Sequence, residues 1–174
     1  MEEIKKIGID ARFFGSKDKG FGRYVENLII NLENIDKINQ YSIFLNRNRE
    51  KEYTPRNPNF RKILIGHNSL WPFKIDKKMK SCDLDLDMIH FTCLPFPVFY
   101  KTKNKIVLTV HDLTWRVFPP FKNPLKKFFY GLIFSNAIKK ADRIIAVSEY
   151  TKKDILSFCK TDQEKIKVIY EGVS

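Results

Sequence analysis

The stretch K-I-V-L-T-V-H, residues 105–111, decides the fold. Its aliphatic and β-branched residues form an unbroken apolar run, which is typical of a strand buried on both faces of a parallel sheet. A histidine ends the run, and Asp112 follows it. Ligands of open parallel sheets bind beyond the carboxyl ends of the strands, so His111 is also the leading candidate for a functional site.

On the carboxyl side of this stretch, helices and strands alternate. Proline is tolerated in the first turn of a helix, and serine is a good helix cap. These rules predict a helix from Pro124 to Ala141, a strand over Arg143–Val147, a helix over Glu149–Phe158 capped by Ser148, and a strand over Ile166–Tyr170.

On the amino side the same alternation appears. A strand over Ile4–Asp10 leads into a glycine loop over residues 15–22 and then an amphipathic helix with apolar positions Val25, Leu28, Ile29, Leu32 and Ile35. Further strands are expected at Tyr41–Asn46, Lys62–Ile65 and Met88–Phe91, with an exposed loop over Arg47–Arg61 and at most one short helix near Ile75–Lys80. Strands alternating with helices predict a single Rossmann-like, doubly wound, mainly parallel α/β sheet forming one domain over residues 1–174.

Length and composition exclude several classes of protein. A chain of 174 residues with 43% hydrophobic residues and 15 Phe builds an ordinary core without disulfide staples. Three widely spaced cysteines, Cys82, Cys93 and Cys159, indicate buried thiols rather than a metal site or secretion. No apolar stretch has the length of a signal peptide core or of a membrane span. The cytoplasm is the expected location.

The net charge of +12 is concentrated in one region. Between Met88 and Ala141 there are nine lysines and arginines, and Asp112 is the sole acid. Such a region attracts anionic partners: nucleic acid, phospholipid headgroups or a phosphate-bearing substrate. A solvated lysine-rich surface is the alternative. Lysines outnumber arginines, which disfavours nucleic acid, because lysine is less suited to bidentate base recognition.

Polar residues at the predicted strand ends are the candidate site residues. They are Asp10, the His90-Phe91-Thr92 stretch, His111 with Asp112, and Ser148 with Glu149. His111 titrates near neutral pH, and Asp112 could influence its charge. Each candidate also has a structural alternative: Asp10 as a loop anchor, Ser148 as a helix cap, His111 and His90 as core residues, and His67 as a surface residue.

The glycine segment Gly20-Phe21-Gly22-Arg23 could present backbone N–H groups and a helix N-terminus to a phosphate. It does not match the dinucleotide fingerprint, because Val25 replaces the third glycine and Asn46 and Arg47 stand where an acid is needed. The P-loop, the zinc motif H-E-x-x-H and the G-x-S-x-G elbow are absent from the sequence. The residues alone thus predict an α/β domain that binds an anion and leave the reaction open.

Several segments together resemble the N-terminal half of a family-4 glycosyltransferase of the GT-B fold. They are I-G-I-D-A-R at residues 7–12, G-F-G-R-Y at 20–24, V-L-T-V-H-D-L at 107–113, A-D-R-I-I-A-V-S-E-Y-T at 141–151 and V-I-Y-E-G-V at 168–173. Their order and spacing cover nearly the whole chain. The resemblance implies a retaining transfer of a sugar from a nucleotide sugar, with neither an essential metal nor a cofactor beyond that donor. The acceptor would be a surface polysaccharide or lipid-linked glycan, and mannose is the sugar that the G-F-G-R-Y variant favours.

The resemblance also assigns roles to residues. It implies that Gly20 and Gly22 contact the donor phosphates, with Phe21 and Arg23 beside them, and that His111 is the histidine next to the transferred sugar. By the same resemblance, Asp112, Ser148 and Glu149 match residues at strand ends near the cleft between the two domains of such enzymes. The paired-glutamate donor motif of a second domain is missing from the sequence. We therefore expect this chain to be an N-terminal acceptor-side domain, either excised or the product of a truncated gene. Such a domain needs its own C-terminal domain and is inactive alone.

A rival hypothesis from another class is a free-standing module that binds anions or membrane surfaces. The segment from Phe118 to Lys140 interleaves aromatic and aliphatic residues with lysines, as interfacial helices do. The two hypotheses are compatible, because lipid-linked acceptors lie at membranes. The sequence therefore also predicts peripheral contact with the inner face of the cell membrane.

Overall fold

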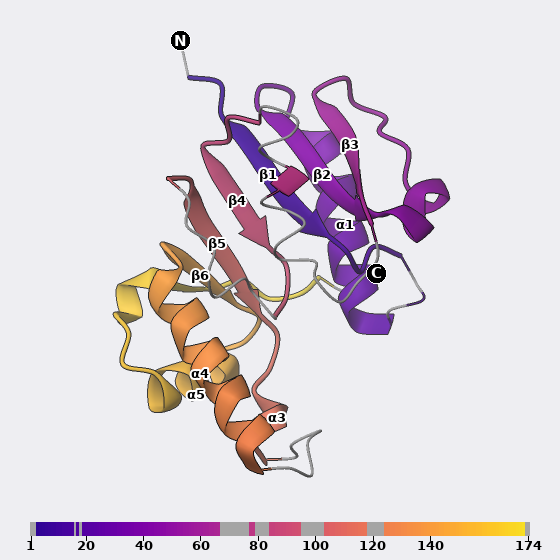
Figure 1. The fold of residues 1–174 in the computed structure, drawn as a ribbon. Coiled ribbons are helices and arrows are strands. Elements are labelled where there is room, and N and C mark those ends of the chain that lie inside the picture. The colour runs from indigo at the N-terminus through magenta and orange to yellow at the C-terminus, as the bar shows by residue number, and fades with distance from the viewer. Residues whose placement is uncertain are drawn as a thin grey trace. The chain divides into compact units, whose positions relative to one another are not determined.

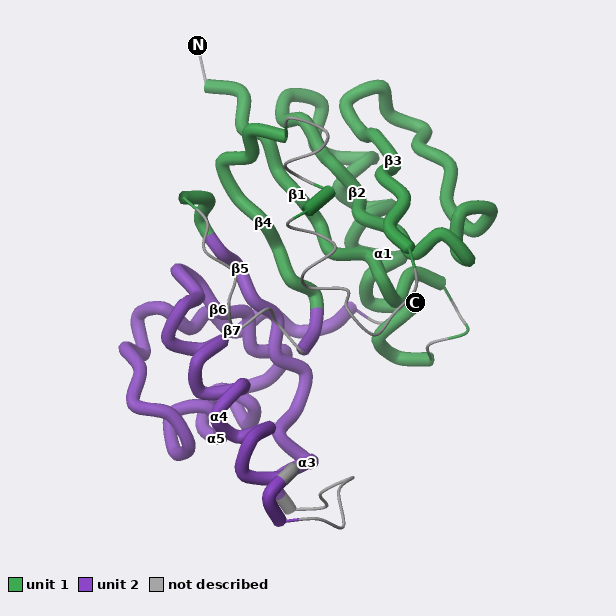
Figure 2. Tube along the Cα trace, in the orientation of Figure 1, with its two compact units in different colours: residues 1–92, 100–105 green, residues 93–99, 106–174 purple. Residues whose placement is uncertain are grey.

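The computed structural model describes residues 3–15, 17, 19–66, 77–78, 84–94, 103–117 and 124–172. The chain forms two compact units (Figure 2). Unit 1 comprises residues 1–92 and 100–105, and unit 2 comprises residues 93–99 and 106–174. Each unit is described by itself below.

Unit 1 is built on four parallel strands (Figure 1). These are β1 (Lys6–Ala11), β2 (Gln40–Asn46), β3 (Phe60–Ile65) and β4 (Met88–Phe91), in the order β3-β2-β1-β4. In the central register, Ile9 lies between Ile43 and His90. The residues of β1 and β2 are buried after the first residue of each strand, as a sheet covered on both faces requires.

Helix α1 (Lys19–Ile35) packs on this sheet through an apolar face. Val25 and Ile29 are fully buried in one cluster with Ile9 and Ile43. Ile35, the last apolar position of the helical pattern and the last residue of the helix, is 76% exposed. The buried residue near the end of α1 is instead a carboxylate, Glu33.

The segment after β2 was expected to be an exposed loop and is anchored instead. It begins with the 3-10 helix η2 (Arg47–Glu52) and returns to α1. The Tyr53 hydroxyl donates to Glu33 Oε1 at 2.9 Å, and the backbone N–H of Arg56 donates to the same oxygen at 3.0 Å. Asn57 Nδ2 donates to the carbonyl oxygen of Glu33 at 3.1 Å. The bonds from Tyr53 and Arg56 satisfy the buried carboxylate, which explains why a charged residue is stable there.

Unit 2 is built on three parallel strands flanked by helices (Figure 1). The strands are β5 (Lys105–Val110), β6 (Arg143–Ala146) and β7 (Ile166–Val168), in that order. The helices are α3 (Thr114–Val117), α4 (Pro124–Lys140), α5 (Glu149–Phe158) and the 3-10 helix η4 (Gln163–Lys165). Leu108, Ile144 and Ile166 are in register and buried on one face.

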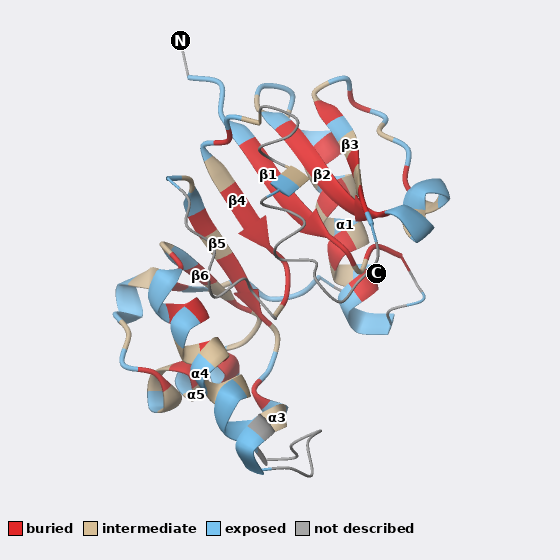
Figure 3. Cartoon of the chain, viewed as in Figure 1, coloured by how far each residue is buried: buried red, intermediate tan, exposed pale blue. Residues whose placement is uncertain are grey.

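An aromatic cluster joins the helices of unit 2. The Trp115 ring lies 4.8 Å from that of Tyr130, and 5.7 Å from those of Phe134 and Phe158. Figure 3 shows exposed residues along helix α4. Its exposed large apolar side chains are Leu125, Phe128, Phe129 and Leu132.

Two cysteines, Cys93 and Cys159, are buried thiols, as the sequence predicts, and both belong to unit 2. Burial raises the pKa of the Cys159 thiol, against the opposing effect of its bond to Ser135. Cys82 lies outside the described residues.

The predicted Rossmann-like parallel α/β fold is confirmed, and α5 has the bounds that the sequence predicts. The glycine loop is corrected: α1 begins at Lys19, so Gly20 to Gly22 form its first turn rather than a loop before it. Of the helix expected near residues 75–80, Lys77 and Lys78 are helical and the remainder lies outside the described residues. Within the described part of the chain, no helix combines the length and apolar character that a membrane crossing needs.

Candidate functional site

His111 follows β5 directly and is held at two points. Its ring Nδ1 lies 2.8 Å from Glu171 Oε1, and its carbonyl oxygen accepts a hydrogen bond from Thr151 Oγ1 at 3.0 Å. The His111 side chain is 12% exposed and that of Glu171 is 45% exposed. The imidazole is thus fixed in direction while remaining accessible, which suits a group that positions a substrate.

Ser148 is the N-cap of α5, as its structural alternative predicts. Its Oγ accepts from the backbone N–H of Thr151 at 3.0 Å and lies 2.9 Å from Thr151 Oγ1. Through Thr151, the cap is connected to the backbone of His111. Glu149 lies in the first turn of α5 and is exposed. The structure therefore brings Ser148 and His111 together through a third residue.

Asp112 has a local role that differs from the expected one. Its Oδ1 accepts from the backbone N–H of Thr114 at 2.9 Å and from the Thr114 hydroxyl at 2.6 Å, which fixes the start of α3. The carboxylate that meets the His111 ring is that of Glu171. Sequence reasoning did not select Glu171, although it follows the last strand of a parallel sheet, as His111 follows β5.

The glycine segment lies in unit 1, in the first turn of α1. A Cβ on Gly22 would lie 1.8 Å from the Gly15 carbonyl oxygen, whereas one on Gly20 would meet nothing within 4 Å. Gly15 itself has φ +95°, a conformation that favours glycine. Gly22 is therefore required for packing, and Gly20 is not.

This first turn is also chemically suited to an anion. The first backbone N–H groups of a helix lack partners within the helix, and the helix dipole makes this end positive. No acidic side chain lies in the first turn of α1. Phe21 is 44% exposed, and Arg23 is exposed as well. The predicted phosphate role of this segment stays a prediction.

Asp10, another candidate at a strand end, is fully buried. Its Oδ2 accepts from Arg12 Nε at 2.9 Å, and its Oδ1 accepts from the Arg12 backbone N–H at 3.2 Å. Thr92 Oγ1 donates to the Asp10 carbonyl oxygen at 2.6 Å. This buried ion pair supports the loop-anchoring alternative. His90 is buried in β4, as expected for a core residue, and His67 lies outside the described residues.

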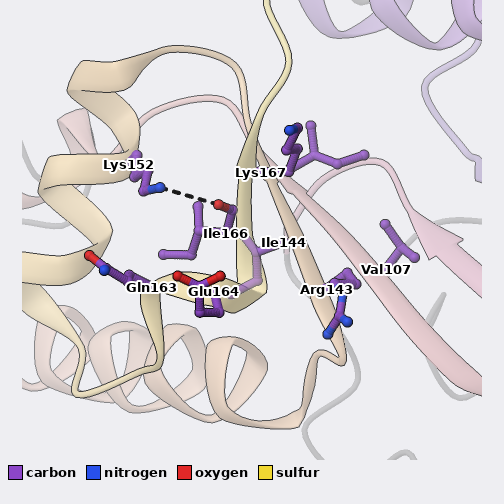
Figure 4. Close-up of a pocket in the computed structure, with 9 residues that line it drawn as sticks. Val107, Arg143, Ile144, Lys152, Gln163, Glu164, Ile166 and Lys167 are labelled. Atoms are coloured by element: carbon purple, nitrogen blue, oxygen red, sulfur yellow. Dashed lines mark hydrogen bonds between the residues drawn. The ribbon is translucent and has the colours of Figure 1, made fainter.

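A cavity of about 580 Å³ lies in unit 2, away from these candidates (Figure 4). One face of the sheet lines it with two pairs of residues in register, Val107 with Arg143 and Ile145 with Lys167. Arg143 begins β6, so the cavity lies toward the amino ends of the strands. His111, Ser148 and Glu149 are not among its lining residues. In a parallel sheet this end is not where ligands are expected.

Among the residues that the structure describes, no three His, Cys, Asp or Glu side chains are grouped so as to hold a metal ion. The prediction that the reaction uses no metal or cofactor remains a prediction.

Comparison with solved structures supports the fold. The chain is similar to Anabaena Alr3699/HepE in complex with UDP, with a TM-score of 0.55 and 15% identity over 98% of this chain and 44% of that one. It is also similar to the lipopolysaccharide outer core galactosyltransferase WaaB, with a TM-score of 0.51 and 17% identity over 97% of this chain and 46% of that one. A third is the wall teichoic acid polymerase TagF, in its H548A form, with a TM-score of 0.56 and 15% identity over 95% of this chain and 38% of that one.

The chain thus spans less than half the length of these three proteins. No curated protein matches it. The family model described as Glycosyltransferase Family 4 matches residues 19–174, which include the first turn of α1, His111, Ser148 and Glu171. The expected resemblance is confirmed, and the chain belongs to Glycosyltransferase Family 4.

Proposed function

We propose that this chain is the acceptor-side half of a retaining glycosyltransferase, which moves a sugar from a nucleotide sugar to a polysaccharide or lipid-linked acceptor. The observation that carries the proposal is the fixed and accessible imidazole of His111 at the carboxyl end of β5. Its support is the family match over residues 19–174.

The proposed role of His111 is to position the reacting sugar. As the bond to the donor breaks, positive charge develops on the sugar and negative charge on the diphosphate. Glu171 holds the imidazole and Thr151 holds the backbone of His111, so the ring can keep a sugar hydroxyl in reactive geometry without reorganising during the reaction. The contribution of His111 is then orientation and electrostatics rather than metal ligation.

The proposed donor contact is the first turn of α1. Gly20, Phe21 and Gly22 lie in the first turn, at the positive end of the helix dipole, and Arg23 adds a positive charge nearby in sequence. A second α/β domain would grip the rest of the nucleotide sugar, so this chain alone would not catalyse transfer. That one structurally similar protein was solved with UDP supports a nucleotide in the reaction.

The acceptor is proposed to be a cell-surface polysaccharide or its lipid-linked precursor, and mannose is the first sugar to test. One similar structure is named for the lipopolysaccharide outer core and another for wall teichoic acid. Such an enzyme would work in the cytoplasm, at the inner face of the membrane.

The test is a transfer assay with labelled UDP- and GDP-sugars. The 174-residue chain is assayed alone and joined to a donor-binding α/β domain. We expect no transfer by the chain alone and transfer by the joined protein, which His111→Ala lowers by about 10²-fold or more. Robust transfer by the purified chain alone would contradict the two-domain proposal, and full activity of His111→Ala would contradict the role of His111.

A second candidate function, binding to anionic membrane surfaces, is favoured by one observation. Helix α4 exposes Leu125, Phe128 and Phe129 by 54–61%, and Lys127 lies among them and is exposed. Each Lys or Arg near an anionic surface contributes about 1 kcal/mol, which fades within a Debye length. Sedimentation with anionic vesicles should therefore fall sharply at high salt. Equal binding to neutral and anionic vesicles would exclude this mode.

A further inference from the structure

A groove of about 390 Å³ lies between helices of unit 2, apart from the residues around His111. Trp115 and Phe158 belong to the aromatic cluster, and Phe128, Gly131 and Leu132 of α4 complete the apolar part of the lining. Its volume falls within the range of about 300–1,000 Å³ for small-molecule sites. The groove is therefore large enough for a small ligand or part of a longer one.

The apolar lining continues onto the surface of the protein. Phe128 is 61% exposed and Leu132 is 44% exposed, although both line the groove. Leu125 and Phe129 are exposed on the same helix. Contiguous apolar surface on a soluble domain marks an interaction or ligand site more often than a chance feature. A ligand with a long apolar part fits this continuity.

The charged groups that line the groove are both cations. The Arg116 guanidinium lies 4.0 Å from the centre of the Phe158 ring, which holds it beside the groove, and Lys127 is exposed. Among the described residues that line the groove, none is acidic. The ligand chemistry that complements these features is an aliphatic chain carrying an anionic oxygen group.

We propose that this groove binds a single-chain lipid phosphate. The alkyl chain lies along Trp115, Phe128 and Leu132, and the phosphate lies near Arg116 and Lys127. The binding itself does not depend on sugar transfer. That the bound lipid is the tail of a lipid-linked acceptor rests on the proposed function.

The test uses the fluorescence of Trp115. The sequence has two tryptophans, so Trp71→Phe leaves Trp115 as the only one. Lysophosphatidic acid brominated at mid-chain is titrated below its critical micelle concentration, so that monomers and not membranes are the ligand. We expect saturable quenching of Trp115, because bromine quenches only at short range.

Gly131→Leu is the decisive variant. A Cβ at Gly131 would lie 3.5 Å from Phe158 Cζ and 3.9 Å from Trp115 Cη2, which is ordinary contact, so a longer side chain enters the groove without displacing the backbone. Leucine also favours a helix more than glycine does. We expect binding at least about tenfold weaker with the melting temperature maintained. Leu132→Ser, at a partly exposed position, is the second variant and should also weaken binding.

Two controls separate this groove from other modes of binding. Leu125→Gln removes an exposed apolar residue outside the groove lining and should leave monomer binding unchanged. Lys127→Gln should weaken binding of the lipid phosphate and leave binding of a brominated monoacylglycerol, which has no charge, unaltered.

Three results would overturn the proposal: no saturable quenching, quenching that Gly131→Leu and Leu132→Ser leave intact, or displacement by an acidic amphipathic peptide with no lipid binding. The last would make the groove a protein-docking site. The two proposals have separate readouts. Sugar transfer without lipid binding would contradict the lipid site alone. Lipid binding without sugar transfer would contradict the proposed function alone.

Discussion

Asp10 and His111 occupy equivalent places near the ends of parallel strands, β1 and β5, yet their surroundings differ. The Asp10 side chain is wholly buried and its carboxylate is paired with Arg12, which is almost as deeply buried. The His111 ring meets a carboxylate that is 45% exposed. A polar residue at a strand end is therefore not by itself a functional residue. The exposure of the residue that it pairs with distinguishes a residue that stabilises the fold from a candidate functional residue.

The largest effect is expected at the buried pair. Asp10→Ala removes the carboxylate that pairs with the buried Arg12 guanidinium, which should lower the free energy of unfolding by about 3–5 kcal/mol. Urea denaturation measures this change. Adding Arg12→Met should restore part of the loss, because it removes the uncompensated charge. Unchanged stability of Asp10→Ala would show that the pair does not anchor the fold.

The second prediction concerns His111 in an active two-domain protein. His111→Ala should lower kcat by about 10²-fold or more, the scale of losing one positioned polar group, while the melting temperature changes little. Glu171→Gln keeps the size of the partner and should cost about tenfold, the scale of one charge-assisted hydrogen bond. If His111→Ala instead destabilises the fold and leaves activity per folded molecule intact, His111 belongs with Asp10 as an anchor.

The third prediction separates two glycines of one segment. Gly22→Ala places a Cβ against the Gly15 carbonyl oxygen and should cost about 1–3 kcal/mol, the range for overpacking a core. Gly20→Ala meets no atom and should be neutral or stabilising by up to about 1 kcal/mol, since alanine favours a helix. Thermal denaturation of both variants provides the comparison, and equal effects would contradict the packing role of Gly22.

The smallest effect is expected at Tyr53 and depends on pH. Burial, together with the hydrogen bond to Glu33, raises the pKa of the Tyr53 phenol above its ordinary value of about 10. The native state therefore retains this proton where the unfolded chain loses it, so the stabilisation is complete below about pH 10 and is lost as the pH rises further. Tyr53→Phe should cost about 1 kcal/mol at neutral pH, the scale of one hydrogen bond.

The measurement for Tyr53 is urea denaturation at neutral pH and above pH 10. The variant should lose less stability than the native chain as the pH rises. Burial also raises the pKa of Tyr41, which bonds to Asp36, so part of the alkaline sensitivity should remain in the variant. A pH profile identical to that of the native chain would mean that the pKa of Tyr53 is the same in the native and unfolded states.

The order of strands and helices could be predicted because each element carries its own pattern. The apolar run at β5 and the serine cap of α5 are local signals, and both predictions are confirmed. The start of α1 was placed too late, because glycine weakens a helical pattern and the reason for Gly22 is its contact with Gly15, a contact that no local pattern contains. The anchored segment after η2 was missed for the same reason: Glu33 and Tyr53 are polar and distant in sequence.

In the candidate site too, local patterns predict some residues, and tertiary contacts decide the rest. His111 and Ser148 could be selected because each stands at a strand end, and Ser148 is also a recognisable cap. That Thr151 links them and that Glu171, rather than Asp112, meets the imidazole depends on tertiary distances. Motif spacing gives no information on which of two carboxylates reaches a ring. Their positions in the folded chain decide it.

The reaction rate of the buried thiols measures how often unit 2 unfolds locally. A maleimide reacts with Cys93 or Cys159 only after the surrounding structure opens, and both lie in unit 2. With Cys82 replaced by serine, the labelling rate reports how often unit 2 opens under native conditions. Amide hydrogen exchange along β1 and β2 gives the corresponding rate for unit 1. Equal opening free energies would mean that the two halves unfold as one cooperative body, and unequal values would show which half yields first.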